Sequence, residues 1–378
     1  MATITNTIPT QYYDRLQEVK QFDESKIGVK GLVDSGLTTI PRIFHQPPHN
    51  LPTPKLNAQK PKLLIPIIDL SDPRSTVVDQ IHHSASILGF FQVINHGIPM
   101  KVMDHVLSSV KSFHELPKTT RMQYYCRDMS RGAGYFTNSN LYESKTAHWK
   151  DSLQVRLSPT PPKWEYVPEV CREALAEWDC EVVKLGKELM GMLSEGLGLE
   201  RERLKDKSFM DSRNLFGHYY PYCPQPELTI GLKWHTDPGL LTVVLQNEII
   251  GLQVKHGEDC IDVEPVPGGL AINIADMLQI MSNDVYKSVE HRVLANPLRE
   301  PRVSVPYFFS PSKADMLCGP LPELVSPQKP AIYRQFTFSD FIQRYVMGEL
   351  QGKTVRNYFK GTGQAGRNIQ KLIRHTLL

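Results

Sequence analysis

Two histidines and one aspartate of this sequence have the types and spacing to bind one metal ion. His235 and Asp237 are separated by one residue, so on an extended strand their side chains point to the same side. His291 lies in the alternating, β-branched stretch 286–293, which predicts a second strand. Two imidazoles and one carboxylate form the facial ligand set of non-haem Fe(II) sites and leave coordination positions open. A His-x-Asp pair alone is equally consistent with a turn or a surface hydrogen bond.

A second pair of polar residues follows shortly after His291. Arg302 and Ser304 are two positions apart, so on a strand they also share a face. A guanidinium beside a hydroxyl is well suited to hold a carboxylate in a bidentate manner. A carboxylate receptor next to an iron site predicts a dicarboxylate cosubstrate.

With these two features in place, residues 65–359 resemble the plant 2-oxoglutarate and Fe(II)-dependent dioxygenases. Besides the segments around His235, His291 and Arg302, the resemblance rests on three ordered motifs: IPIIDL at 65–70, GFFQVINHGIP at 89–99 and YYPYCPQPEL at 219–228. It implies a mixed α and β fold, with a double-stranded β-helix (jelly roll) core surrounded by α-helices. It also implies Fe(II), 2-oxoglutarate and O2 as reaction partners and ascorbate as reductant.

The resemblance assigns roles to further residues. Tyr220 is expected to contact the distal carboxylate of 2-oxoglutarate together with Arg302 and Ser304, although a buried structural tyrosine is the alternative. His218 stands where the family commonly has asparagine, and it is either a wall of the pocket or a further imidazole near the metal. The residues expected to line an apolar substrate pocket are Phe136, Phe216, Phe308 and Ser310. Structural roles are expected for His96, Asp69, Asn273 and Asp276, while Glu290 should face away from the iron.

Three N-terminal segments narrow the resemblance to the homologues of 1-aminocyclopropane-1-carboxylate oxidase, a subgroup that includes desacetoxyvindoline 4-hydroxylase-like enzymes. These segments are QFDE at 21–24, GVKGLVDSG at 28–36 and IPRIF at 40–44. The expected reaction is hydroxylation of a moderately hydrophobic specialised plant metabolite, of alkaloid, steroidal or phenolic class, with succinate and CO2 as coproducts. Desaturation and demethylation would use the same site.

Two other functions remain open at this point. A true 1-aminocyclopropane-1-carboxylate oxidase shares the triad and the Arg-x-Ser pair but uses ascorbate and no 2-oxoglutarate; the long N-terminal extension argues against it. A non-catalytic jelly-roll protein that binds a metabolite is the other alternative. The intact triad and Arg302 argue against that function.

Composition excludes several classes of protein. The net charge of +3 is small and the basic residues are scattered, so no nucleic-acid partner is expected. The six cysteines form no Cys-x-x-Cys pair, which disfavours a zinc ribbon and fits reduced thiols in the cytoplasm. Neither a leader peptide nor a long apolar run is present, so no membrane segment is expected. We expect a cytoplasmic monomer that acts on a small molecule.

Four regions should position these residues. Residues 1–64 are expected to be an N-terminal extension and linker, with one amphipathic helix over 11–32 and a structureless, proline-marked connector over 47–61. Residues 65–200 should be a helix-rich region. Its helices are predicted where apolar residues recur every three or four positions, at 77–88, 100–116 and 170–197.

The jelly-roll domain is expected at 201–360. Short Val/Ile/Leu-rich runs, such as 240–245 and 271–274, alternate with Gly, Pro and Asn turns between 215 and 309. The tail 361–378 contains a Gly-x-Gly-x-x-Gly string, but this string follows a helical segment and lacks the βαβ unit of a dinucleotide site. The phosphate-loop-like string at 348–354 predicts only a helix end with a glycine cap.

Overall fold

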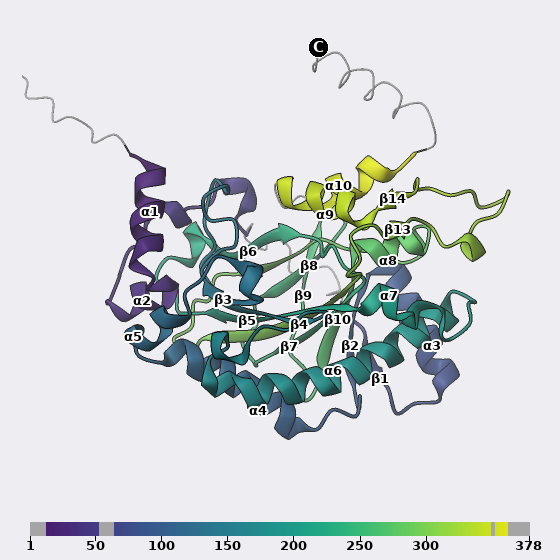
Figure 1. The fold of residues 1–378 in the computed structure, drawn as a ribbon, viewed down its shortest axis with the longest axis horizontal. Helices are drawn as coiled ribbons and strands as arrows, with labels where there is room; N and C mark the ends of the chain where they lie inside the picture. Colours follow the sequence, from purple (N-terminus) through teal and green to yellow (C-terminus); the bar gives the residue numbers. More distant parts are fainter. Residues whose placement is uncertain (1–12, 53–63, 349–351, 362–378) are drawn as a thin grey trace, which may run out of the picture.

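Two facing β-sheets form the centre of the computed structural model, which describes residues 13–52, 64–348 and 352–361 (Figure 1). In spatial order, the larger sheet contains β1 (Ile67–Asp69), β2 (Phe90–Ile94), β10 (Leu270–Ile274), β7 (Leu241–Gln246), β12 (Arg302–Ser310), β5 (Ser212–Tyr220), β4 (Asp151–Ser158) and β3 (Ala133–Phe136). The smaller sheet contains β6 (Ile230–His235), β11 (His291–Leu294), β8 (Leu252–His256) and β9 (Asp259–Asp262). A two-stranded pair, β13 (Leu317–Cys318) with β14 (Phe336–Thr337), lies apart from them. The mixed α and β jelly-roll fold is therefore confirmed.

Helices cover the outer face of the larger sheet, and further helices lie near the first and the last described residues. They are α1 (Arg15–Ser25), α2 (Gly28–Asp34), α3 (Arg74–Ile87), α4 (Met100–Glu115), α5 (Lys118–Arg121), α6 (Glu169–Gly196), α7 (Lys207–Met210), α8 (Asp276–Met281), α9 (Phe338–Met347) and α10 (Gly352–Phe359). The three helices predicted at 77–88, 100–116 and 170–197 correspond to α3, α4 and α6 within a few residues. None of the helices in the described part of the chain combines the length and the apolar character that a bilayer crossing requires.

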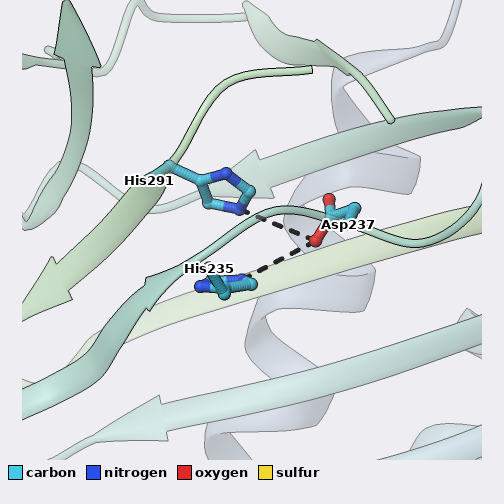
Figure 2. Close-up of side chains that lie close together, drawn as sticks. All are labelled: His235, Asp237 and His291. Carbon is cyan, nitrogen blue, oxygen red and sulfur yellow. Dashed lines mark ion pairs between the residues drawn. The ribbon is translucent and has the colours of Figure 1, made fainter. Parts of the chain in front are cut away.

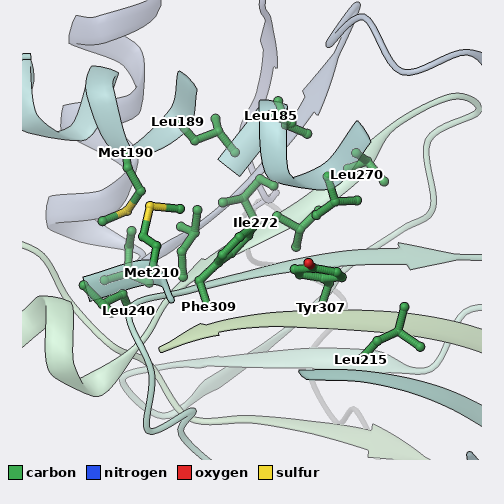
Figure 3. Packing of buried hydrophobic residues seen from close by; sticks show 14 of the residues in the cluster. Leu185, Leu189, Met190, Met210, Leu215, Leu240, Leu270, Ile272, Tyr307 and Phe309 are labelled. Atoms are coloured by element: carbon green, nitrogen blue, oxygen red, sulfur yellow. The ribbon is translucent and has the colours of Figure 1, made fainter. Parts of the chain in front are cut away.

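Side chains of β12 point alternately into the apolar core under the helices and into the inside of the jelly roll. Tyr307 and Phe309 are buried on the outer face, in the same cluster as Leu185 and Leu189 of α6 (Figure 3). Successive side chains on a strand point to opposite faces, so Arg302, Ser304 and Phe308 point inward. Packing of the helices against the outer face thus fixes which residues of β12 face the second sheet.

The N-terminal segment differs from the single helix predicted over 11–32. It contains two helices, α1 and α2, because Lys26 and Gly28 have positive φ angles of 51° and 68°. The break lets α2 begin over the buried carboxylate of Asp151 on β4. This carboxylate accepts hydrogen bonds from the backbone N–H groups of Val29 (2.9 Å) and Lys30 (2.8 Å).

The prediction of a structureless connector over 47–61 is wrong for its first part. Pro48–Asn50 forms a 3-10 helix, in which proline supplies the required φ angle. Just before it, Phe44 is fully buried and packs edge-to-face on Trp149, with 5.0 Å between the ring centroids. Residues 53–63 lie outside the described residues.

The predicted region boundaries at 64, 200 and 360 stay a prediction. Strands from both sides of residue 200 share the larger sheet, where β4 pairs with β5. Beyond Gly361 the predicted tail lies outside the described residues. At the predicted glycine cap, α9 ends at Met347 and Gly348 is its C-cap, whose N–H donates to the Arg344 carbonyl.

Gly28 offers a test of how the N-terminal segment is anchored. A Cβ at Gly28 would lie 2.3 Å from Tyr135 Oη and 2.6 Å from the Asp151 carboxylate, at a φ angle that side chains rarely adopt. Left-handed strain together with weakened bonds to Asp151 should lower the free energy of unfolding of Gly28→Ala by about 3–5 kcal/mol. Gly36→Ala is the matched control, because its φ is 77° but nothing lies within 4 Å. Equal losses for the two variants in chemical denaturation would contradict this anchoring.

Candidate metal and cosubstrate site

His235, Asp237 and His291 converge inside the jelly roll, as Figure 2 shows. Asp237 Oδ1 lies 3.6 Å from His235 Nε2 and 3.7 Å from His291 Nε2. The ligand-type atoms of all three side chains lie within 4.8 Å of one another. Residues that are far apart in sequence therefore present two nitrogens and one oxygen to a common point, as an ion requires.

The triad is positioned by strand ends rather than by continuous strands. β6 stops at His235, so Asp237 lies beyond the strand that was expected to carry both residues. β11 begins at His291, and 286–290 are not part of it, contrary to the predicted strand over 286–293. The two histidines are nevertheless direct partners in the antiparallel pairing of β6 and β11.

Hydrogen bonds to the backbone direct the candidate metal-binding nitrogens toward Asp237. The Nδ1 atoms of His235 and His291 lie 2.9 Å and 3.2 Å from the carbonyl oxygens of Lys233 and Val289. A neutral imidazole that donates from Nδ1 has its lone pair on Nε2, the atom that faces the centre of the triad. Burial, followed by the nearby charge of His291, lowers the pKa of His235 to about 4, so this ring is neutral at pH 7.

Asp237 is held so that one of its oxygens remains available. Its Oδ2 atom accepts hydrogen bonds from Thr242 Oγ1 (2.6 Å) and Asn273 Nδ2 (2.8 Å), while Oδ1 faces the histidines. Burial raises the pKa of Asp237, but the imidazoles and these two hydrogen bonds outweigh it and keep the pKa below its ordinary value. The charged carboxylate, the two imidazoles and their fixed orientation fit a divalent iron ion.

A second buried carboxylate, Asp276 at the start of α8, ties the two loops of the triad together. It accepts hydrogen bonds from Thr236 Oγ1 (3.0 Å), which lies between the first two triad residues, and from Ser288 Oγ (2.6 Å), shortly before His291. Arg356 of α10 forms an ion pair with it. Burial raises the pKa of Asp276 to about 6, although Arg356 lowers it. Asp276 thus has a structural role, as predicted, at the centre of the site's support.

Arg302, Ser304 and Tyr220 lie together on the inner face of the larger sheet. Arg302 Nη1 donates to Ser304 Oγ at 3.3 Å, and its guanidinium lies 5.0 Å from the centre of the Tyr220 ring. Arg302 is only 1% exposed, and no carboxylate of the described residues pairs with it. Its Nε atom has no hydrogen-bond partner among those residues. A buried guanidinium with neutral partners has donor capacity left for a carboxylate.

One cavity of about 50 Å³ joins the triad to this arginine. Of the four residues predicted for the substrate pocket, Phe308 lines the cavity, and Phe216 packs against Phe308 with 5.6 Å between ring centroids. Phe136 and Ser310 lie outside its lining, at the ends of β3 and β12. Glu290 is directed to Lys255, with which it forms an ion pair at 3.3 Å.

Sequence reasoning missed Lys150 and Ser152, which lie beside the cavity. Lys150 Nζ donates to Ser152 Oγ at 2.9 Å and lies 3.2 Å from His218 Nδ1, and His218 lines the cavity. The available signal was the spacing of Lys150 and Ser152, which places both side chains on one face of a strand, opposite to Asp151. Only the pairing of β4 with β5 brings them to His218.

Comparisons with known proteins agree with this site. Residues 212–311 match the family model of the 2OG-Fe(II) oxygenase superfamily, and residues 65–173 match that of the non-haem dioxygenase in morphine synthesis N-terminal family. The chain is 43% identical over 355 residues to 1-aminocyclopropane-1-carboxylate oxidase homolog 1 of Arabidopsis thaliana, covering 92% of this chain and 97% of that protein. It is 42% identical to deacetoxyvindoline 4-hydroxylase of Catharanthus roseus, covering 87% and 85%. A crystal structure of JOX2 in complex with 2OG, Fe and JA has a TM-score of 0.79 at 32% identity, covering 89% of this chain and 98% of that one.

Substitution of two threonines tests whether Asp276 positions the triad. Thr236→Val removes the hydroxyl that donates to Asp276 but preserves the shape of the side chain. Loss of such an outer contact should weaken Fe(II) affinity by roughly ten-fold or more, measured by metal titration under anaerobic conditions. Thr229→Val is the control, because the fully buried Thr229 hydroxyl has no partner among the described residues. If both variants bound Fe(II) as tightly as the wild type, Asp276 would not position the triad.

Proposed function

The chain belongs to the 2OG-Fe(II) oxygenase superfamily and is a dioxygenase that depends on Fe(II) and 2-oxoglutarate; from this premise we propose that it hydroxylates a moderately hydrophobic specialised plant metabolite. The observation that carries the proposal is the single cavity between the buried triad and Arg302, with Phe308 in its wall. A metal site, a carboxylate receptor and an apolar surface are the three parts that such a reaction requires.

Each part of the cavity has a proposed role. His235, Asp237 and His291 would hold Fe(II), and Arg302, Ser304 and Tyr220 would bind the distal carboxylate of 2-oxoglutarate. When bound, iron and 2-oxoglutarate supply the power to insert oxygen from O2 into a C–H bond, with succinate and CO2 as coproducts and ascorbate as reductant. The protein orients these partners and limits the access of water, since the triad side chains are at most 11% exposed and Arg302 is 1% exposed.

Apolar side chains support a hydrophobic substrate. Phe308 and Phe216 form an edge-to-face pair beside the cavity, and we propose that Phe136 and Ser310 contact the more distant part of the substrate. Among the relatives, one is named for hydroxylation of deacetoxyvindoline and one was crystallised with JA. These names support a small organic molecule without identifying it.

We further propose that the enzyme acts as a monomer in the cytoplasm. All six cysteines are unpaired in the structure, which agrees with reduced thiols. The competing function is ethylene formation by a 1-aminocyclopropane-1-carboxylate oxidase, since several relatives bear that name as homologues. The requirement for 2-oxoglutarate separates the two functions.

Arg302→Leu tests the cosubstrate. Loss of the guanidinium would leave a buried carboxylate unpaired, which costs about 2–5 kcal/mol. Affinity for 2-oxoglutarate should therefore fall by roughly thirty-fold to several thousand-fold, while Fe(II) still binds. Arg299→Leu is the control, because Arg299 lies over the ring of Tyr222, away from the cavity lining. Ethylene release by the wild type without 2-oxoglutarate, or normal 2-oxoglutarate dependence of Arg302→Leu, would contradict the proposal.

Phe308→Ala and Phe216→Ala test the substrate wall. A change of one methylene in a hydrophobic pocket alters discrimination by roughly 1–3 kcal/mol, so both variants should change which metabolites of a panel are oxidised. Consumption of 2-oxoglutarate without substrate should persist, because neither ring belongs to the triad or to the arginine site. Phe309→Leu alters the opposite face of the same strand and should leave the ranking of substrates unchanged. Identical rankings in all three variants would remove Phe308 and Phe216 from the pocket.

A further inference from the structure

Lys150, Ser152 and His218 form a buried polar group next to the cavity, here called the Lys150 cluster. Ser152 of β4 is paired in register with His218 of β5, and the two side chains meet at 2.8 Å. Lys150 precedes β4 and places its ammonium between them, 2.9 Å from Ser152 Oγ and 3.2 Å from His218 Nδ1. The cluster has no part in holding the metal or the cosubstrate as proposed above.

The ammonium of Lys150 is buried without an opposing charge. The residue is 7% exposed, and among the described residues no carboxylate forms an ion pair with it. The side chain of its neighbour Asp151 points to the other side of β4. There it accepts hydrogen bonds from the backbone N–H groups of Val29 and Lys30 and from the hydroxyl of Thr137. Burial lowers the pKa of Lys150 to about 7. A buried cation with only neutral partners favours the arrival of an anion.

His218 presents a hydrogen-bond donor to the cavity. Burial, followed by the charge of Lys150, holds its pKa well below the ordinary value, so the ring is neutral. Its Nδ1 atom faces the Lys150 ammonium, which can only donate, and therefore acts as an acceptor. The proton of the neutral ring then lies on Nε2, and His218 lines the cavity. A second buried imidazole, His148, has an Nε2 atom without a partner among the described residues.

The Lys150 cluster and Arg302 lie on opposite sides of β5. Arg302 of β12 is the register partner of Tyr220, while β4 flanks β5 on its other edge. His218 and Tyr220 of β5 lie between the two cations, and Phe216 packs on His218 at 5.3 Å and on Phe308 at 5.6 Å in the adjacent part of the inner face. The site thus has two separate cationic positions, and 2-oxoglutarate would use only the one at Arg302.

We propose that the Lys150 cluster binds a carboxylate group of the substrate, so that the molecule oxidised is a hydrophobic carboxylic acid. The inference rests on the proposed function and specifies its substrate class. The acidic end accepts a hydrogen bond from His218 Nε2, the Lys150 ammonium on the other side of the imidazole attracts its charge, and the apolar body lies against Phe216 and Phe308. Lys150 is then a specificity-determining residue that selects for the charged end of the substrate.

The test compares acids with their uncharged esters. Protein loaded with Mn(II) and 2-oxoglutarate, which does not turn over, is titrated calorimetrically with aromatic and alicyclic carboxylic acids and with the methyl ester of each. We expect acids to bind the wild type roughly thirty-fold or more tightly than their esters, because the ester cannot pair with a buried cation. Lys150→Met should abolish this preference, whereas Lys150→Arg retains part of it. Lys184→Met, at an exposed lysine of α6, should leave it unchanged.

The outcomes separate this inference from the proposed function. Equal affinity of acids and esters for the wild type, no binding of any acid, or an unchanged preference in Lys150→Met would overturn the carboxylate assignment. The wild-type comparison decides this even if a variant fails to fold. Succinate formation from 2-oxoglutarate is measured in parallel with Fe(II). Its absence from the wild type would overturn the proposed function, and its persistence in Lys150→Met together with loss of acid preference would support both.

Discussion

The geometry of the site depends on the hydrogen bonds that the buried carboxylate of Asp276 accepts from Thr236 and Ser288. The two strands that bring His235 and His291 together do not extend over the metal position, since β6 ends at the first histidine and β11 begins at the second. The loops that complete the triad are instead held by hydrogen bonds from Thr236 and Ser288 to one carboxylate, which Arg356 of the C-terminal helix neutralises. Helix α8, the loops next to β6 and β11, and helix α10 thus together fix the geometry of the triad.

Charged side chains are unevenly distributed around the cavity. Asp237 is the only carboxylate in its lining among the described residues, and it faces two imidazoles, whereas Arg302 lines the same space without an anionic partner. Lys150 adds a second buried cation behind His218. The interior therefore carries unbalanced positive charge in an apolar setting, where electrostatic interactions are weakly screened. Such an interior favours the binding of carboxylates.

Residue spacing predicted the His235 and Asp237 pair, the Arg302 and Ser304 pair and the three long helices, because these patterns are local. His291 was added from its residue type, its strand-like surroundings and the family resemblance. The features that the sequence did not predict are set by residues distant in the chain. The interval between His235 and Asp237 indicates a shared side, but not that β6 ends at His235 or that Thr236 donates to the distant Asp276. The break between α1 and α2 depends on Asp151, more than a hundred residues away. Lys150 becomes part of the site only through strand register, which depends on pairing with β5 that the local pattern does not encode.

Metal analysis of the wild type and of a His235→Ala, Asp237→Ala double variant tests the central claim most directly. Both proteins are reconstituted anaerobically with Fe(II), freed of excess metal, and checked for folding by circular dichroism. The structure predicts one iron per chain in the wild type and none in the folded double variant, because two of the three converging ligands are removed. Full iron occupancy in the folded double variant would contradict the assignment of this triad as the metal site.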